Sequence, residues 1–184
     1  MEIILKAITD AREWQQAQDL AEKPSSQLPL ISSRFGSPRQ APSSTMTICN
    51  VDGAWDPSTK NCGFGGVFSG WRPHREIEPL QASHRFVSSA LMAEALAIRS
   101  AVMHAALLNI KSLMILSDSL SLVQLLKEGG SVPALFGILF DIYHFSSTFY
   151  VISFSYVPRL SNIMADSVAK SALLLLNSTS FNGV

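Results

Sequence analysis

The chain has 184 residues, of which 47% are hydrophobic and 15% are charged, and its 14 basic residues equal its 14 acidic residues in number. A charged share well below the usual ~25% leaves enough apolar material for a core and excludes a chain that is disordered throughout. The net charge of zero excludes a strongly basic nucleic-acid-binding protein, so any contact with phosphates must come from a local patch.

The N-terminal quarter has two parts. Residues 2–22 predict an amphipathic helix, because Ile4, Ile8 and Trp14 lie near one stripe of a helical projection. Residues 24–45 then contain four Pro and seven Ser, a composition that blocks regular structure. We therefore expect an N-terminal helix (1–22), a flexible linker (23–45), one folded domain (46–178) and a C-terminal tail (179–184).

The first half of the domain alternates between strand and helix patterns. Residues 47–52, 63–69 and 82–87 show period-two or Gly-punctuated apolar patterns and are separated by turn-rich pieces, which predicts an antiparallel meander. Ser88 and Ser89 then offer an N-cap. Residues 90–109, rich in Ala, Leu and Met without Gly or Pro, predict a long helix.

The second half predicts two further strands and three further helices. A short apolar strand (112–117) precedes a helix (119–128) that ends at Gly129-Gly130, and Pro133 opens another helix to about Phe145. A last strand (150–157) leads to a last helix (161–176) capped by Ser161. The order βββαβααβα places the chain in the α/β class and predicts a five-stranded mixed sheet with helices packed on it.

The cysteines and the longest apolar segments indicate in which cellular compartment the protein is expected. Cys49 and Cys62 can form neither a disulfide framework nor a four-thiolate zinc site, which favours a reducing environment. The first residues lack the features of a secretory signal, and the longest apolar region (101–116) is interrupted by His104, Asn109 and Lys111. We expect an intracellular, monomeric protein without membrane contact, in the cytoplasm or the nucleus.

Four carboxylates stand where a purely structural sequence would not need them: Asp52 inside a strand, Glu94 on an apolar helix stripe, Asp118 at a strand end and Asp166 in the last helix. Singly, each has an ordinary explanation as a turn, cap or first-turn acid. Jointly, they would repel one another unless a cation neutralised them. Oxygen ligands without His or Cys indicate Mg²⁺ or Mn²⁺, and such a cluster can hold two ions about 3.5–4 Å apart for phosphodiester chemistry.

These acids lie in segments that together resemble the ribonuclease H domain, most closely the plant ribonuclease H-like proteins related to the reverse transcriptases of non-LTR retroelements. The resemblance covers residues 46–175 and rests on four segments that each contain one of the acids and on the Gly-rich second strand: Asn50–Ala54, Gly63–Val67, Ala93–Ala97, Leu116–Ser119 and Val157–Lys170. The segment Asp10–Trp14 is similar to the one that precedes this domain in the plant proteins.

The resemblance implies the ribonuclease H-like fold, cleavage of the RNA strand of RNA–DNA hybrids, and two Mg²⁺ or Mn²⁺ ions. It implies that Asp52, Glu94, Asp118 and Asp166 are the metal ligands and catalytic residues. The residues that it places near the substrate are Asn50, Gly53, Ser117, Ser119, Arg159 and Asn162. Strand-end or first-turn polarity is the alternative explanation for the polar ones among them.

Two departures from the family pattern favour a second hypothesis. Many active members carry a His on the loop before the last helix, and the matching position here is Tyr156. The segment Lys127–Ser131 is short and neutral where some members carry a basic protrusion. The alternative is therefore a retroelement-derived module that binds nucleic acid or protein with little or no turnover. A 3′–5′ exonuclease of related fold fits the Asn-x-x-x-Asp helix less well.

Basic and aromatic residues outside the acids are candidates for nucleic-acid contact. Arg72, His74, Arg75 and Arg85 gather near the second and third strands, where they form either a phosphate-facing patch or a solvated edge. Trp55 can stack on a nucleotide or pack against the core.

Overall fold

A computed structural model of the chain describes residues 46–70 and 77–181. The predicted N-terminal helix (2–22) with its Asp10–Trp14 segment, the linker (23–45), and the basic residues Arg72, His74 and Arg75 lie outside the described residues.

The described part contains a five-stranded mixed sheet in the order β3-β2-β1-β4-β5, which confirms the predicted α/β class. The first three strands pair antiparallel, whereas β4 is parallel to both β1 and β5. The strands are β1 (Thr47–Trp55), β2 (Cys62–Ser69), β3 (Leu80–His84), β4 (Ser112–Ser117) and β5 (Val151–Tyr156).

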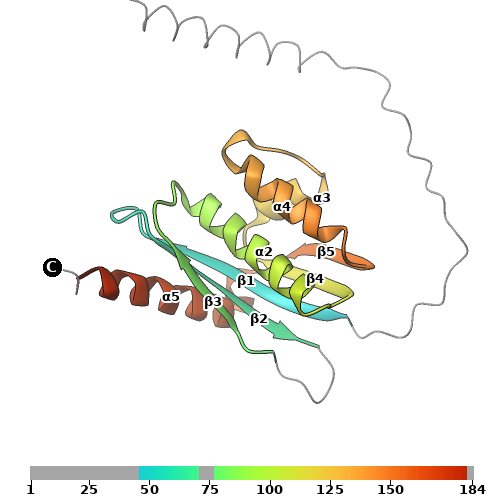
Figure 1. The fold of residues 1–184 in the computed structure, drawn as a ribbon, viewed down its shortest axis with the longest axis horizontal. Coiled ribbons are helices and arrows are strands. Elements are labelled where there is room, and N and C mark those ends of the chain that lie inside the picture. Colours follow the sequence, from blue (N-terminus) through green and yellow to red (C-terminus); the bar gives the residue numbers. More distant parts are fainter. Residues whose placement is uncertain (1–45, 71–76, 182–184) are drawn as a thin grey trace, which may run out of the picture. The chain divides into compact units, whose positions relative to one another are not determined.

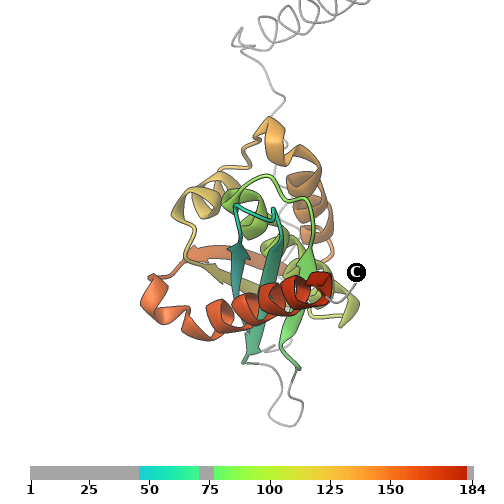
Figure 2. The ribbon, with the colours of Figure 1, turned by 90° about the vertical axis from the view of Figure 1, so that its left-hand side faces the viewer.

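Helices cover both faces of the sheet. Three of them, α2 (Ala90–Leu107), α3 (Leu120–Lys127) and α4 (Phe136–Ser146), lie on one face, and α5 (Ile163–Phe181) crosses the other face over β2 and β1 (Figures 1 and 2). The predicted cap of α2 is confirmed, because the Ser89 hydroxyl accepts a hydrogen bond of 3.1 Å from the backbone N–H of Met92.

The core of the domain lies between the sheet and α2. Among the described residues, α2 is long and apolar enough to cross a bilayer by length and composition. However, eight of its residues are buried in the hydrophobic core, where the helix packs on β1. This placement is that of the central helix of a globular α/β domain.

Several predicted element boundaries differ from the observed ones. β3 ends at His84, not at Val87, because Phe86 adopts a φ of 60° and the Val87 N–H bonds to the Lys60 carbonyl outside the sheet. Pro133 opens a 3-10 turn (Pro133–Leu135), and the α-helix begins only at Phe136. Ser161 belongs to a 3-10 turn (Arg159–Ser161), and the residue before α5 is Asn162, whose carbonyl accepts the N–H of Asp166. Helix α5 continues to Phe181, beyond the predicted end at residue 176.

Glycines bring both helix layers into backbone contact with the central hairpin. A Cβ on Gly53 would lie 2.6 Å from the carbonyl carbon of Ala93 in α2, on one face of the sheet. A Cβ on Gly63 would lie 2.2 Å from the Ala169 carbonyl oxygen in α5, and one on Gly65 would lie 2.7 Å from that of Ala165. Since any side chain would force the layers apart, these glycines set how closely α2 and α5 approach β1 and β2.

Candidate functional site

Three acidic side chains from three separate elements meet at one edge of the sheet. Asp52 lies on β1, Glu94 lies in α2, and Asp118 follows β4 directly. One carboxylate oxygen from each lies within 4.8 Å of the others. The local structure explains the meeting, because β1 and β4 run parallel, and the close approach of α2 at Gly53 places Glu94 above β1.

Burial and mutual repulsion raise the pKa values of two carboxylates in the cluster, Glu94 and Asp52. Burial, followed by the charges of Asp52 and Asp118, raises the pKa of Glu94 to about 8, although a hydrogen bond from the Gly53 backbone and the charge of Arg159 lower it. Burial, followed by the charges of Asp118 and Asp166, raises the pKa of Asp52 to about 7. Each added negative charge makes ionisation of its neighbours harder, so the cluster favours either protons or a bound cation.

An unpartnered oxygen shows that the residues fit a metal ion. Within the described part of the chain, the Oε2 atom of Glu94 is buried and has no hydrogen-bond partner. A buried acceptor without a partner costs free energy that a cation would recover. The donors are all carboxylate oxygens, the type that hard divalent cations prefer. Asp52, Glu94 and Asp118 are therefore a possible metal site.

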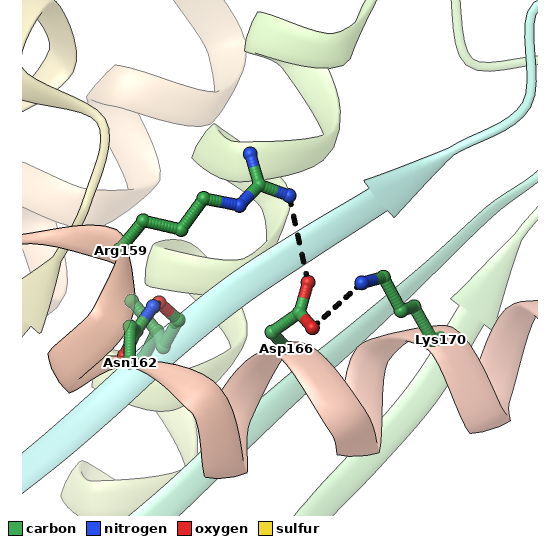
Figure 3. Close-up of polar contacts among 5 residues, drawn as sticks. Arg159, Asn162, Asp166 and Lys170 are labelled. Carbon is green, nitrogen blue, oxygen red and sulfur yellow. Dashed lines mark hydrogen bonds and ion pairs between the residues drawn. The ribbon is translucent and has the colours of Figure 1, made fainter.

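The fourth predicted acid, Asp166, lies in the first turn of α5 and is not among the three clustered carboxylates. Its Oδ2 accepts a hydrogen bond of 2.7 Å from the Lys170 ammonium, and its Oδ1 lies 3.6 Å from the guanidinium of Arg159 (Figure 3). It still acts on the cluster, since its charge and a hydrogen bond with Asp52 both raise the pKa of Asp52. Asp166 thus connects the acidic cluster to the positively charged side chains of Lys170 and Arg159.

Asn162, a predicted substrate-contact residue, connects α5 to β1. Its side chain is 1% exposed, and its Nδ2 donates a hydrogen bond of 2.9 Å to the carbonyl of Val51. Its Oδ1 accepts one of 3.2 Å from Asn50, another predicted contact residue. The bonds join the start of α5 to the strand that carries Asp52, so Asn162 fixes the position of the helix that bears Asp166 (Figure 3).

Replacing Asn162 by Ala is expected to lower the free energy of unfolding by about 1–3 kcal/mol, because the carbonyl of Val51 would lose its buried donor. Chemical denaturation measures this loss. Ser161→Ala is the matched control, since Ser161 is exposed and lies in the 3-10 turn before Asn162. Its free energy of unfolding should stay within about 0.5 kcal/mol of the wild-type value. A larger loss for Ser161→Ala than for Asn162→Ala would contradict the assignment.

The other predicted contact residues have different surroundings. Ser117 is buried, and its hydroxyl accepts a hydrogen bond of 3.1 Å from the Ser119 backbone N–H just before α3. Gly53 faces α2, as described above, so its missing side chain is explained by packing. Arg159 is largely exposed, and its charge lowers the pKa of both Asp52 and Glu94.

Tyr156 is the last residue of β5 and so lies within the predicted strand (150–157), although the family's His that it matches lies on the loop before the last helix. It pairs with Ser117 in the parallel register and is 46% exposed. The basic residue on that loop is Arg159. The sequence analysis also gave no role to Lys170, although its i,i+4 spacing from Asp166 is the usual signal of a helical ion pair.

Comparison with known proteins gives a family and a fold. The model of a family described as reverse transcriptase-like matches residues 50–172. No curated protein matches the chain in sequence.

Solved structures of RNase H proteins match the fold. The N-terminal RNase H domain of a Mycobacterium tuberculosis protein is similar with a TM-score of 0.66 and 21% identity over 74% of this chain and 99% of that chain. RNase H1 from the archaeon Halobacterium salinarum has a TM-score of 0.63 and 21% identity, covering 70% of this chain and 97% of its own. LC11-RNase H1 from compost, solved with an RNA/DNA hybrid, has a TM-score of 0.60 and 18% identity, covering 69% of this chain and 96% of its own. At these identities the likeness establishes the RNase H-like fold.

Proposed function

The chain belongs to the reverse transcriptase-like family, and on this premise we propose that it is a metal-dependent endonuclease that cleaves the RNA strand of RNA–DNA hybrids. The observation that carries the proposal is the meeting of Asp52, Glu94 and Asp118, whose oxygens lie within 4.8 Å of one another. LC11-RNase H1, which has the same fold, is a protein solved in complex with such a hybrid. We also propose that the chain shares its origin with the plant ribonuclease H-like proteins related to the reverse transcriptases of non-LTR retroelements.

In this proposal Asp52, Glu94 and Asp118 hold the metal, with Asp166 at its border, and Mg²⁺ or Mn²⁺ fits their oxygen donors. Two such ions, when bound, would activate water and neutralise charge on the scissile phosphate. The chain itself supplies position and charge. Asn162 and the glycine contacts fix the elements that carry the acids, and the exposed Arg159 offers guanidinium donors to a phosphate oxygen beside them.

A strand-specific cleavage assay tests this proposal. The chain is incubated with a hybrid whose RNA and DNA strands carry different fluorophores, in Mg²⁺, in Mn²⁺ and in excess chelator. We expect cleavage of the RNA strand only, with either metal, and none with the chelator or with Asp118→Asn, which removes one charged ligand while keeping the shape of the side chain. Cleavage by the wild type no greater than that by Asp118→Asn would refute the proposal.

A second candidate is a nucleic-acid-binding module that keeps this fold without turnover. The ion pairs of Asp166 with Lys170 and Arg159 favour it, because they leave only three of the four predicted acids in the oxygen cluster. The same assay separates the two, with a gel-shift measurement on the uncleaved hybrid as a second readout. Binding of the hybrid without cleavage in either metal would select the module.

A further inference from the structure

The loop between β3 and α2 carries an aromatic side chain in an unusual position. Phe86 is 88% exposed, and its backbone has a φ of 60°. The left-handed region disfavours a bulky residue by about 1 kcal/mol or more, and exposing the ring gives up the burial that phenylalanine normally gains. Such a conformation persists only where the surrounding structure imposes it, and it is often associated with a functional site.

Contacts on both sides of the loop impose this conformation. The N–H of Val87 donates a hydrogen bond of 2.8 Å to the carbonyl of Lys60 in the β1–β2 turn, and the Trp55 indole donates one of 2.8 Å to the carbonyl of Val87. The Val87 side chain is buried. The loop and the turn therefore lie side by side (Figure 2), and anchoring Val87 leaves the ring of Phe86 in solvent.

Two basic residues lie near Phe86, one beside it in the chain and one in the adjacent turn. Arg85 precedes Phe86 and is exposed, and Lys60 has its ammonium 5.0 Å from the centre of the Trp55 ring. The nearby acid Asp56 carries a negative charge, since hydrogen bonds from Ser58 and Thr59 lower its pKa to about 2, and the same bonds hold its carboxylate within the turn. The surface made by Lys60, Arg85 and Phe86, called here the Phe86 platform, thus combines an exposed ring with two cations.

This combination fits an unpaired nucleotide. Every base has a face that stacks on an aromatic ring, and the linked phosphates are attracted to Lys and Arg. A surface that binds a protein partner usually has a wider apolar patch than a single exposed ring accompanied by two cations. The position of the platform also agrees with a role beside the carboxylate cluster. Trp55, which bonds to the loop, follows Asp52 by three residues, or about 10 Å along β1. Since β1 and β4 are parallel, Trp55 lies toward the same end of the sheet at which Asp118 follows β4.

We propose that the Phe86 platform binds a single-stranded nucleic-acid segment, with Phe86 stacking on one base and Lys60 and Arg85 contacting its phosphates. The inference rests on the proposed function, in which this segment is the unpaired strand that continues from the hybrid at the carboxylate cluster. It adds a preference for hybrids with single-stranded overhangs over blunt ones.

Fluorescence anisotropy with a labelled oligothymidine of about 12 nucleotides tests the proposal in chelator, where no cleavage occurs. Phe86→Asn removes the ring while Asn tolerates the left-handed backbone, so its Tm should equal or exceed that of the wild type. We expect its affinity to fall about tenfold, and Phe86→Trp to retain binding, because it keeps a stacking surface. Phe140→Asn is the control, since Phe140 is an exposed ring on α4 outside the platform, and its affinity should match that of the wild type.

Unchanged affinity in Phe86→Asn would overturn the proposal, as would a wild type that does not bind the oligonucleotide, and the exposed ring would then be assigned to a protein partner. Arg85→Gln should reduce the salt dependence of binding, with a slope smaller by about 0.7 in log units. Because these measurements need neither metal nor cleavage, their failure is distinct from failure of the hybrid-cleavage assay.

Discussion

Replacing Glu94 by Gln is expected to raise the melting temperature of the metal-free protein at about pH 8.5 and to remove the stabilisation that divalent cations in the proposed metal site would give to the wild type. Burial and the charges of Asp52 and Asp118 raise the pKa of Glu94 from 4.5 to about 8, so its ionised form is destabilising in the folded state. The amide has the same shape without the charge. We expect a gain of about 2 kcal/mol, or roughly 5–10 °C, because relaxation and partial solvation reduce the ideal ~1.4 kcal/mol per pKa unit.

The sign follows from proton linkage. A carboxyl whose folded-state pKa is raised binds its proton more tightly in the folded protein, so this stabilisation is complete below the unfolded-state pKa and is lost as the pH rises through the folded value. For Glu94 and Asp52 that loss extends from about pH 4 to values near 8 and 7 respectively. The metal-free wild type is therefore expected to become less stable over this range, whereas a divalent cation in the proposed site would bind more tightly as the protons leave.

Differential scanning fluorimetry across pH, with chelator and with added Mn²⁺, measures both effects. Glu78→Gln is the matched control, since Glu78 is an exposed carboxylate outside the cluster, and it should change stability by less than about 0.5 kcal/mol. A metal-free Glu94→Gln protein less stable than the wild type at high pH would show that the carboxylate has a structural partner. An equal gain in Tm with Mn²⁺ for the variant and the wild type would place the metal elsewhere.

Gly63→Ala is expected to destabilise the domain by about 3 kcal/mol or more, or to prevent folding. The added methyl carbon would lie 2.2 Å from the carbonyl oxygen of Ala169 and 2.3 Å from the backbone nitrogen of Leu173, so α5 would have to move away from β2. Backbone atoms of a helix cannot change rotamer as a side chain can, which is why a single methyl group has so large an effect.

Gly137→Ala in α4 is the matched control, because a Cβ there meets nothing within 4 Å. It should raise the free energy of unfolding by about 0.5–1 kcal/mol, the difference in helix propensity between Ala and Gly. Urea denaturation of both variants measures the contrast, and circular dichroism reports whether Gly63→Ala folds. A cost below about 1 kcal/mol for Gly63→Ala would mean that α5 is less closely packed on β2 than the structure shows.

Local patterns predicted the elements well where a residue's neighbours in sequence decide its conformation. The β4 strand has the predicted bounds, and Ser89 caps α2 as expected. They failed where a distant group decides, as at Val87, whose N–H bonds to Lys60, and at Asn162, whose side chain is engaged with Val51. The hydrophobic periodicity of a sequence does not predict such partners, since they depend on how the elements pack.

The candidate site was predictable to a similar degree. Four acids in matching elements pointed to a common position, and three of them, Asp52, Glu94 and Asp118, lie together in the oxygen cluster. The Asp166–Lys170 ion pair could have been predicted from its i,i+4 spacing. The pairing of Asp166 with Arg159 and the influence of Arg159 on the pKa values of the other acids could not, because they depend on side-chain directions at the start of α5. In the sequence, Gly63 and Gly65 indicated only a Gly-rich second strand of the family pattern, and the structure gives them a packing role.

The glycine contacts also limit how far the elements around the cluster can separate. Gly53 holds β1, which carries Asp52, against α2, which carries Glu94, and Gly65, which pairs with Asp52, holds β2 against α5. Because these contacts are between backbones, the frame that carries Asp52 and Glu94 cannot widen without breaking them. We therefore expect the proposed metal site to suit a small cation with contacts of about 2.0–2.1 Å, such as Mg²⁺, better than Ca²⁺, which needs more ligands at about 2.3–2.6 Å. Loosening the contacts is expected to widen the range of ions that bind.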